Sequence, residues 1–425
     1  MITAIFIGGF LLLLAMGMPI ALALIVPSVL YMFYFGYPLP TVAHTLTNAL
    51  DSFPLLAVPL FVLVGNLMGT SGIAHRLFHF AHLCVAHWRG GMVQVNILAS
   101  LIFSGSSGSA LADIGGMGAV QIRAMKEVGY KGSFAAAVTA VSATTGPIFP
   151  PSIPLVIFAA TAETSAVKLL MAGILPGILI TIFLMGFSAW LARRRGYPTG
   201  EKASRSELWD AFVKALPALL TPVVLVAGMT GGVFTATEAA AFTVFYILLI
   251  TIFIYRDFKF SSLIDSTWET AKTTVVLMIM VAASVLFTRM LALEQVPQMI
   301  ASGMLTLSDN PLILLLLVNV VVLLVGFFLD TTSAILILAP LIVPPLVAVG
   351  VDPTHLGIVV VYNLMIGLIT PPMGMSLFLA STVAKEPITA VLRQVLPYYV
   401  TLLAVLVLLT YIPAISTWLP SMMMN

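Results

Sequence analysis

The sequence predicts an all-α polytopic membrane protein that is built as an inverted-topology repeat. Of its 425 residues, 60% are hydrophobic and only 8% are charged. Apolar runs of about 20 residues recur from one end of the chain to the other, and each can cross a hydrocarbon layer of ~30 Å. Glycines and prolines of the first half also reappear at a constant distance in the second half. These features place the chain in a membrane and divide it into two related halves.

The repeat has an offset of 221 residues and needs no gap. It pairs Gly105 with Gly326, Gly146 with Gly367, Pro150 with Pro371, Pro151 with Pro372, Thr161 with Thr382, and Pro176 with Pro397. Glycine and proline set backbone shape, so their coincidence indicates a shared fold. We expect a first repeat over residues 1–200, a cytoplasmic linker with an interfacial helix over 201–221, and a second repeat over 222–425.

Each half is expected to hold five spans and one hairpin. In the first half, the spans lie near residues 2–15, 18–35, 54–73, 134–160 and 168–192. Because five is odd, the two halves must face opposite sides of the membrane. If the N-terminus is outside, the inner loops collect the Lys and Arg residues, apart from Lys168 in an outer loop and Arg289 within a span. The positive-inside rule therefore places both termini on the non-cytoplasmic side.

Two amphipathic segments are expected to lie flat on the membrane surface. In residues 205–216, Leu208, Phe212 and Leu216 share one helical face, and the charged residues lie elsewhere. Residues 261–274 overlay on residues 41–53 by the repeat offset. One horizontal helix in each half would form a rigid frame, and ordinary interfacial loops are the alternative.

Each half also contains a hairpin with a polar tip. The first hairpin, residues 92–128, carries "SGSSGS" (104–109) at its apex and enters from the cytoplasm. Its counterpart, residues 312–350, carries "GFFLDTTS" (326–333) and enters from outside. Unpaired backbone groups in hydrocarbon cost several kcal/mol each, so protein, water or ions must satisfy these re-entrant tips.

A broken transmembrane helix is expected opposite each tip, over residues 134–160 and 356–382. Both contain glycine followed by tandem proline, in "GPIFPPS" and "GLITPPM". Proline removes a donor and unwinds a helix, which frees carbonyl oxygens that bind cations. Hydroxyl groups complete an oxygen-rich shell that suits Na⁺, and they belong to Ser104, Ser106, Ser107, Thr144, Thr145, Thr331, Thr332 and Thr370. Half-helix N-termini at the tips favour an anionic substrate.

Other functions are possible for these motifs. "SGSSGS" also suits close helix packing, and "GSSG" suits an intramembrane serine protease, although all six histidines fall in predicted surface segments.

Three acidic residues lie within the predicted membrane segments. Asp330 either lies near an ion or caps the helix that starts at Thr331. Asp113 either stabilises the first hairpin or tunes the site. Glu238 is better explained as a structural cap or a subunit contact than as a substrate contact. No phosphate-binding loop, nucleic-acid patch or metal-ligand cluster is present, and the single Cys84 excludes an internal disulfide.

Five segments resemble the large membrane subunit of tripartite ATP-independent periplasmic (TRAP) transporters over essentially the whole chain. They are "FSGSSGSALAD", "ATTGPIFPPSIP", "GGVFTATEAAA", "GFFLDTTSAILILAPL" and "GLITPPMGMSLF". The resemblance implies an elevator-type transporter of the ion transporter superfamily in the bacterial inner membrane. It also implies two or more Na⁺ coupling ions, an organic anion substrate and a periplasmic binding protein. Because four extra N-terminal spans are missing, the four-helix small membrane subunit is expected as a separate polypeptide.

The resemblance also implies roles for particular residues. The first Na⁺ site would use Ser104, Ser107, Gly146, Phe149 and Pro150. The second would use Gly326, Thr331, Gly367, Thr370 and Met373. The substrate would contact Ser106, Ser107, Ser109, Asp330, Thr331, Thr332, Pro151 and Pro372.

The expected function is Na⁺-driven import of a small carboxylate, namely sialic acid, another sugar acid or a C4-dicarboxylate. We favour sialic acid on overall resemblance. The alternative is a stand-alone Na⁺/dicarboxylate symporter of the same superfamily, which needs no binding protein. An ion channel or an assembly scaffold would accumulate no substrate, and no enzyme activity is expected.

Overall fold

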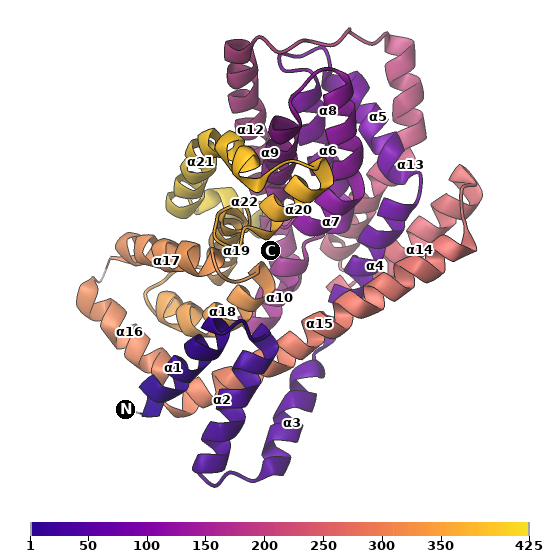
Figure 1. The fold of residues 1–425 in the computed structure, drawn as a ribbon. Coiled ribbons are helices and arrows are strands. Elements are labelled where there is room, and N and C mark those ends of the chain that lie inside the picture. Colours follow the sequence, from indigo (N-terminus) through magenta and orange to yellow (C-terminus); the bar gives the residue numbers. More distant parts are fainter. Residues whose placement is uncertain (1, 309, 424–425) are drawn as a thin grey trace.

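The computed structural model describes residues 2–308 and 310–423, and within them all regular secondary structure is helical (Figure 1). The first half contains α1 (Ile2–Ala15), α2 (Ile20–Tyr34), α3 (Leu39–Leu50), α4 (Ala57–Thr70), α5 (Ile73–Val85), α6 (Met92–Ser107), α7 (Ala110–Asp113), α8 (Ala119–Glu127), α9 (Gly132–Ser142), α10 (Ile153–Thr161), α11 (Ala166–Ala172) and α12 (Ile174–Arg195). The second half contains α13 (Arg205–Thr230), α14 (Ala236–Leu249), α15 (Phe260–Leu293), α16 (Val296–Leu307), α17 (Pro311–Gly326), α18 (Thr331–Ala348), α19 (Pro353–Leu368), α20 (Met375–Ala384), α21 (Ile388–Tyr411) and α22 (Ala414–Met423).

Seven helical segments of the described chain are long and apolar enough to cross a membrane. They are Phe53–Thr70, Ala166–Arg195, Arg205–Thr230, Ala236–Tyr255, Phe260–Leu293, Thr331–Ala348 and Ile388–Tyr411. Shorter apolar helices include Met92–Gly105, Pro311–Gly326 and Pro353–Leu368. These helices confirm the prediction of an all-α polytopic membrane protein.

The helix bounds of the two halves follow the offset of 221 residues. The helical run 110–127, which contains α7 and α8, becomes 331–348, the bounds of α18. Shifted in the same way, α9 becomes 353–363 and lies within α19, while α10 becomes 374–382 and overlaps α20. Both broken helices are therefore interrupted where the glycine and proline pattern predicts.

The structure differs from the prediction at the linker and at the second horizontal segment. The helix that begins at Arg205 does not end near residue 221, because α13 continues past Pro217 and Pro222 to Thr230. Residues 261–274 form the first part of the continuous helix α15, whereas their counterpart α3 is separate. Proline in a membrane helix is tolerated when its neighbours satisfy the freed carbonyl groups, so composition alone does not fix such boundaries.

The two broken helices contact helices of the opposite half of the chain. Helix α9 contacts α20 and α21, and α10 contacts α18 and α19. A second group surrounds them, in which the 34-residue α15 crosses the molecule and contacts α2, α3 and α4 (Figure 1). The broken helices therefore lie beside a group of longer helices that includes α15.

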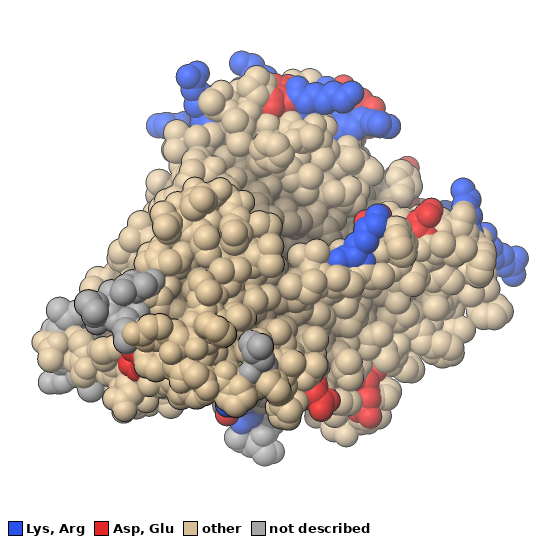
Figure 2. Space-filling view, turned by 60° about the horizontal axis from the view of Figure 1, so that its bottom comes forward, with Lys and Arg blue, Asp and Glu red and all other residues tan. Residues whose placement is uncertain are grey.

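The surface charge is distributed unevenly. In the face shown in Figure 2, Lys, Arg, Asp and Glu lie mainly along the upper, right and lower edges, and the broad area between them is mostly uncharged. An uncharged band between charged edges is the pattern of a protein that spans a bilayer.

Candidate functional site

The first polar tip lies between α6 and α7. Helix α6 ends at Ser107, and Gly108 follows with a left-handed φ of 61°. Ser109 begins α7, and its hydroxyl accepts a hydrogen bond from the Ala112 amide at 3.4 Å. The chain thus reverses over two residues, with one supplying positive φ and the next capping the returning helix.

The first tip rests directly on the first helix break. After α9, a 3₁₀ turn covers Ala143–Thr145, and α10 begins only at Ile153. The Ile153 amide donates a hydrogen bond to the Gly108 carbonyl at 3.3 Å. A Cβ on Gly108 would lie 2.6 Å from the Pro151 carbonyl oxygen, so only glycine fits at this position.

The second tip is built in a related way. Asp330 is the N-cap of α18, and its Oδ2 accepts from the amides of Thr332 and Ser333 at 3.0 and 3.2 Å. The Phe327 carbonyl accepts a hydrogen bond from the Met373 amide at 3.2 Å, which ties this tip to the second break. The capping role is therefore confirmed for Asp330.

Close backbone contact joins the second hairpin to the second broken helix. A Cβ on Gly367 would lie 2.5 Å from the Gly326 carbonyl oxygen. A Cβ on Gly326 would lie 3.5 Å from the Gly367 Cα. These two glycines allow one main chain to approach the other, which brings the Gly326 carbonyl group against Gly367.

A cleft of about 530 Å³ lies between the tips, the breaks and the surrounding helices. Its lining comes from both halves, including α2, α4, α7, α10, α15, α18 and α19. Its polar lining residues are Asn66, Ser107, Ser109, Thr273, Asp330, Thr331 and Thr332. No Lys, Arg or His of the described chain lines it. Its size and its few convergent polar groups suit a small organic ligand.

Two hydroxyl groups in the cleft have properties that fit a cation. The Ser107 Oγ and the Thr331 Oγ1 are buried, and neither has a hydrogen-bond partner among the described residues. Buried polar atoms without partners are rare in proteins, so each of these oxygens is available to a bound ion, substrate or water. Both belong to the predicted Na⁺ sites, one in each half.

The hydroxyls of Ser104 and Thr370 are also compatible with cation binding. Ser104 Oγ donates to the Leu101 carbonyl at 2.7 Å, and Thr370 Oγ1 donates to the Ile366 carbonyl at 2.7 Å. A hydroxyl that donates its proton to its own helix retains its lone pairs as acceptors. These oxygens can therefore face a cation without losing a bond.

The structure brings most of the predicted site residues together. A Cβ on Gly146 would lie 3.5 Å from the Ser104 Cβ, and the Phe149 ring lies beside Gly105. Pro151 is buried against Gly108, whereas Pro372 is exposed, and neither lines the cleft as described. The Ser106 backbone belongs to α6, but its side chain lies outside the described residues.

Two cleft residues were missed by the sequence interpretation. Asn66 of α4 donates from Nδ2 to the Thr270 Oγ1 at 2.9 Å, and Thr273 follows one turn later on α15. Asn66 is a polar amide inside the apolar run 54–73, and that signal alone could have marked it as a functional candidate.

Other predictions about polar residues had mixed outcomes. Glu238 forms a capping box with Thr235 at the start of α14, which confirms its structural role. The placement of all histidines in surface segments is wrong for His355, which is 2% exposed. Its ring nitrogens lie 2.8 Å from the Ser416 Oγ and 3.2 Å from the Thr410 carbonyl. The Ser107 hydroxyl has no histidine partner in the described chain, so a serine-protease arrangement is not formed there.

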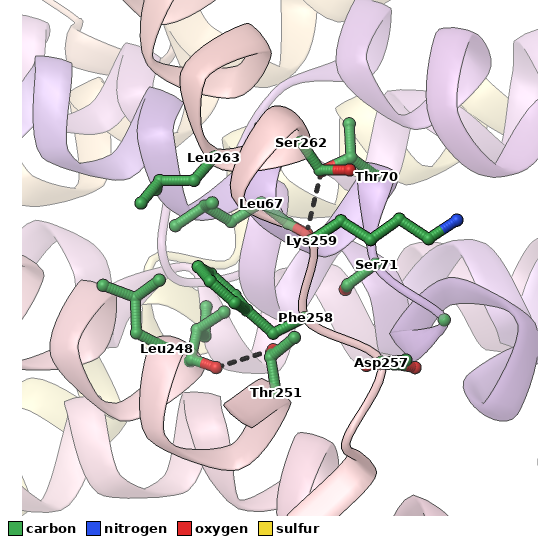
Figure 3. A pocket seen from close by; sticks show the side chains of 12 residues that line it. Leu67, Thr70, Ser71, Leu248, Thr251, Asp257, Phe258, Lys259, Ser262 and Leu263 are labelled. Carbon is green, nitrogen blue, oxygen red and sulfur yellow. Dashed lines mark hydrogen bonds between the residues drawn. The ribbon is translucent and has the colours of Figure 1, made fainter. Parts of the chain in front are cut away.

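A second, smaller cleft of about 230 Å³ lies where α4 and α14 end and α15 begins (Figure 3). Asp257 lines it, and its Oδ2 accepts from Arg76 Nη1 at 2.7 Å. The Lys259 side chain extends away from Phe258 in this view (Figure 3). None of the predicted site residues lines this cleft, so the larger cleft is the candidate site.

The chain matches a known protein family over most of its length. Residues 7–415 match the family described as "Tripartite ATP-independent periplasmic transporter, DctM component". Over 420 residues it is 42% identical to the sialic acid TRAP transporter large permease protein SiaM of Vibrio cholerae, covering 99% of this chain and 98% of that protein. It is 40% identical to the C4-dicarboxylate TRAP transporter large permease protein DctM of Pseudomonas aeruginosa, covering 90% and 89%.

Further relatives differ in length and in the named substrate. The isethionate TRAP transporter permease protein DctMQ of Oleidesulfovibrio alaskensis is 38% identical, and the match covers 96% of this chain but 65% of that protein. Among solved structures, the YdaH transporter of Alcanivorax borkumensis matches with a TM-score of 0.60 at 16% identity, covering 88% of each chain. That likeness concerns the fold alone.

Proposed function

This chain belongs to the DctM family of TRAP transporters, and we propose that it is the large permease of a Na⁺-coupled importer of a small organic acid. The observation that carries the proposal is the cleft in which both tips and both helix breaks meet. An oxygen-rich site without cationic side chains suits coupling cations together with an anion that hydroxyls and amides can bind.

The substrate is a carboxylate in this proposal, and sialic acid is the preferred candidate. The relatives are named for sialic acid at 42% identity, for C4-dicarboxylate at 40%, and for 2,3-diketo-L-gulonate at 37%. Within the cleft, the hydroxyls of Ser107, Ser109 and Thr332 and the Asn66 amide can donate to a carboxylate. The N-terminal ends of α7 and α18 add positive dipole ends.

Two Na⁺ ions bind beside the substrate in this proposal. One is held at the first tip by Ser104, Ser107 and the carbonyl oxygens of Gly146, Phe149 and Pro150. The other is held at the second tip by the hydroxyls of Thr331 and Thr370 and the carbonyl oxygens of Gly326, Gly367 and Met373. The unpartnered hydroxyls of Ser107 and Thr331 support one site in each half.

The transport step in this proposal is an elevator motion in the bacterial inner membrane. The two hairpins and broken helices move as one body against the frame that includes α4 and α15, and both termini lie in the periplasm. A separate four-helix small membrane subunit supports the frame, and a periplasmic binding protein delivers the substrate. The matches to TRAP large permeases over nearly their full length support this assembly.

Reconstitution tests this function directly. Proteoliposomes that contain this chain and its small subunit should accumulate sialic acid only with an inward Na⁺ gradient and the cognate binding protein outside. Replacing Na⁺ by K⁺ should abolish accumulation. Uptake that needs no binding protein would instead identify a stand-alone Na⁺/dicarboxylate symporter, and a lack of accumulation with every TRAP-type acid would contradict the proposal.

A further inference from the structure

The interior of the first hairpin contains a buried polar cluster that the cleft does not use. Asn96 Nδ2 donates to the Thr139 Oγ1 at 2.8 Å, and the Ser142 hydroxyl donates to the Asn96 Oδ1 at 2.9 Å. Ser100 Oγ lies 3.0 Å from the Ser142 Oγ, and Gln121 Nε2 donates to Ser100 Oγ at 3.3 Å. The cluster thus joins α6, α8 and α9.

Asp113 adds a carboxylate to this cluster. Its side chain lies beside the Ser100 hydroxyl, and the residue is 1% exposed. Neither carboxylate oxygen makes a hydrogen bond of normal geometry with the described residues, and the Gln121 Oε1 is also without a donor. Three buried acceptor oxygens around Ser100 therefore need a positively charged or hydrogen-bonding partner.

The described segments that pack against α7 supply no charged partner. The segments packed against α7 are α4, α6, α20, the π-helical turn Ile114–Gly118 and the 3₁₀ turn Ala143–Thr145. None of these segments contains Lys, Arg, His, Asp or Glu. On α8, Arg123 and Lys126 are exposed to solvent. A buried carboxylate without a counter-charge is strongly unfavourable, so the ionised form of Asp113 would need a cation from outside the chain.

The fold itself does not require these polar residues. In the second half, the positions that correspond to Asn96, Ser100, Asp113 and Gln121 are Leu317, Val321, Ala334 and Ile342. The corresponding hairpin arm is the continuous α-helix α18, whereas the first arm contains the π-helical turn directly after Asp113. A π-helical turn within a helix often marks a functional site. The cluster is therefore an addition to the repeat.

We propose that the Asp113 carboxylate, the Gln121 Oε1 and the Ser100 Oγ bind one Na⁺ inside the first hairpin. Carboxylate, amide and hydroxyl oxygens are hard ligands, and a monovalent cation neutralises one carboxylate. Asp113, Ser100 and Gln121 do not line the cleft, so this ion is additional to the two of the proposed function. Binding of this ion can be measured on purified protein without a transport assay.

The test counts Na⁺ bound to the purified protein by equilibrium dialysis with radioactive Na⁺ against a K⁺ background. Wild-type protein should bind one Na⁺ per chain in the first hairpin in addition to the two Na⁺ in the cleft. The variant Asp113→Asn should bind one fewer, because the amide removes the charge and places an NH₂ group among the ligands. Asp352→Asn is the matched control, since Asp352 only caps α19 and asparagine also caps.

A second pair of variants keeps the proposal testable if Asp113→Asn does not fold. Asp113→Ala combined with Gln121→Ile copies the second repeat and should fold while losing one ion. Ser107→Ala combined with Thr331→Ala should weaken the cleft sites but retain the hairpin ion. Unchanged Na⁺ binding in Asp113→Asn, as expected for a protonated carboxyl group or a buried water, would overturn this inference alone. Absence of Na⁺ binding in wild-type protein would overturn both this inference and the proposed Na⁺ coupling.

Discussion

At the scale of single residues, the clearest feature is the pair of unpartnered hydroxyls on Ser107 and Thr331. Each belongs to a different half of the chain, and each lines the same cleft. A hydroxyl that served only for helix packing would be expected to bond its own helix, as those of Thr181 and Thr243 do. The two free oxygens therefore favour ligand binding over close packing of small residues.

The first prediction concerns these two hydroxyls. Ser107→Ala and Thr331→Ala should each raise the Na⁺ concentration for half-maximal uptake about fivefold, because one neutral oxygen ligand contributes about 1 kcal/mol. Sialic acid uptake in proteoliposomes, titrated with Na⁺, measures the effect. Thr267→Ala is the control, since Thr267 is exposed on α15 and bonds only the Leu263 carbonyl. An unchanged Na⁺ titration in both variants would remove these residues from the sites.

The second prediction separates two roles of Asp330. Asparagine is as good an N-cap as aspartate, so Asp330→Asn should preserve the cap on α18 and leave the melting temperature nearly unchanged. Transport should nevertheless decrease at least tenfold, because the charge beside the cleft is lost. Asp330→Ala should additionally lower the unfolding free energy by about 1 kcal/mol. Wild-type transport by Asp330→Asn would show that the residue serves only as a cap.

The sequence predicted the residues at which the backbone must be irregular, and it missed those that depend on packing. Gly146, Gly367 and the tandem prolines mark the breaks because their backbone preferences are local. Asn66 reaches the cleft only because α4 turns one particular face toward it, and His355 is buried because α22 covers the start of α19. Neither orientation is encoded by neighbouring residues along the chain.

At the scale of secondary-structure elements, α4 and the first tip are in close contact. A Cβ on Gly65 would lie 3.2 Å from the Ser107 Cα and 3.4 Å from its carbonyl oxygen. Because α4 belongs to the surrounding frame, this is where the frame meets the site. The repeat pattern predicts both elements but not this contact between them.

The third prediction uses that contact. Gly65→Val should lower uptake strongly and destabilise the protein by about 1–3 kcal/mol, because extra methyl groups would force the tip away from α4. Gly65→Ala should have a smaller effect in the same direction. Uptake and the melting temperature are both measured. Gly69→Ala is the control one turn further along α4, where the nearest atom to a new Cβ would be at 3.9 Å. Equal effects at both positions would contradict the importance of the contact.

The fourth prediction concerns the glycine pair of the second half. Gly367→Ala should abolish Na⁺-dependent uptake, because its Cβ would lie 2.5 Å from the Gly326 carbonyl oxygen and would separate two carbonyl groups of the proposed site. Gly186→Ala on α12 should be neutral, since a Cβ there meets no atom within 4 Å. Uptake by both variants, normalised to the amount of inserted protein, provides the comparison. Normal Na⁺-dependent uptake by Gly367→Ala would contradict the close backbone approach.

At the scale of the whole molecule, the sequence anticipated the repeat better than the boundaries between its parts. The helix bounds follow the offset from α7 to α20, because the apolar runs and breaks recur together there, whereas α3 and α4 are separate and both correspond to the continuous α15. The linker was misjudged because α13 continues past two prolines, and nothing local in residues 205–222 shows whether neighbouring helices support it. Tertiary contacts decide such boundaries.

The fifth prediction tests the orientation of the two halves. If each half crosses the membrane an odd number of times and the basic loops are cytoplasmic, the C-terminal helix α22 must lie outside and the linker inside. In a Cys84→Ala background, Ser421→Cys should react with a membrane-impermeant maleimide in spheroplasts, whereas Lys202→Cys should react only after permeabilisation. Both positions are exposed, so access through the membrane decides the result. Labelling of Lys202→Cys in sealed spheroplasts would contradict the inverted arrangement, and with it the idea that the two tips enter the bilayer from opposite sides.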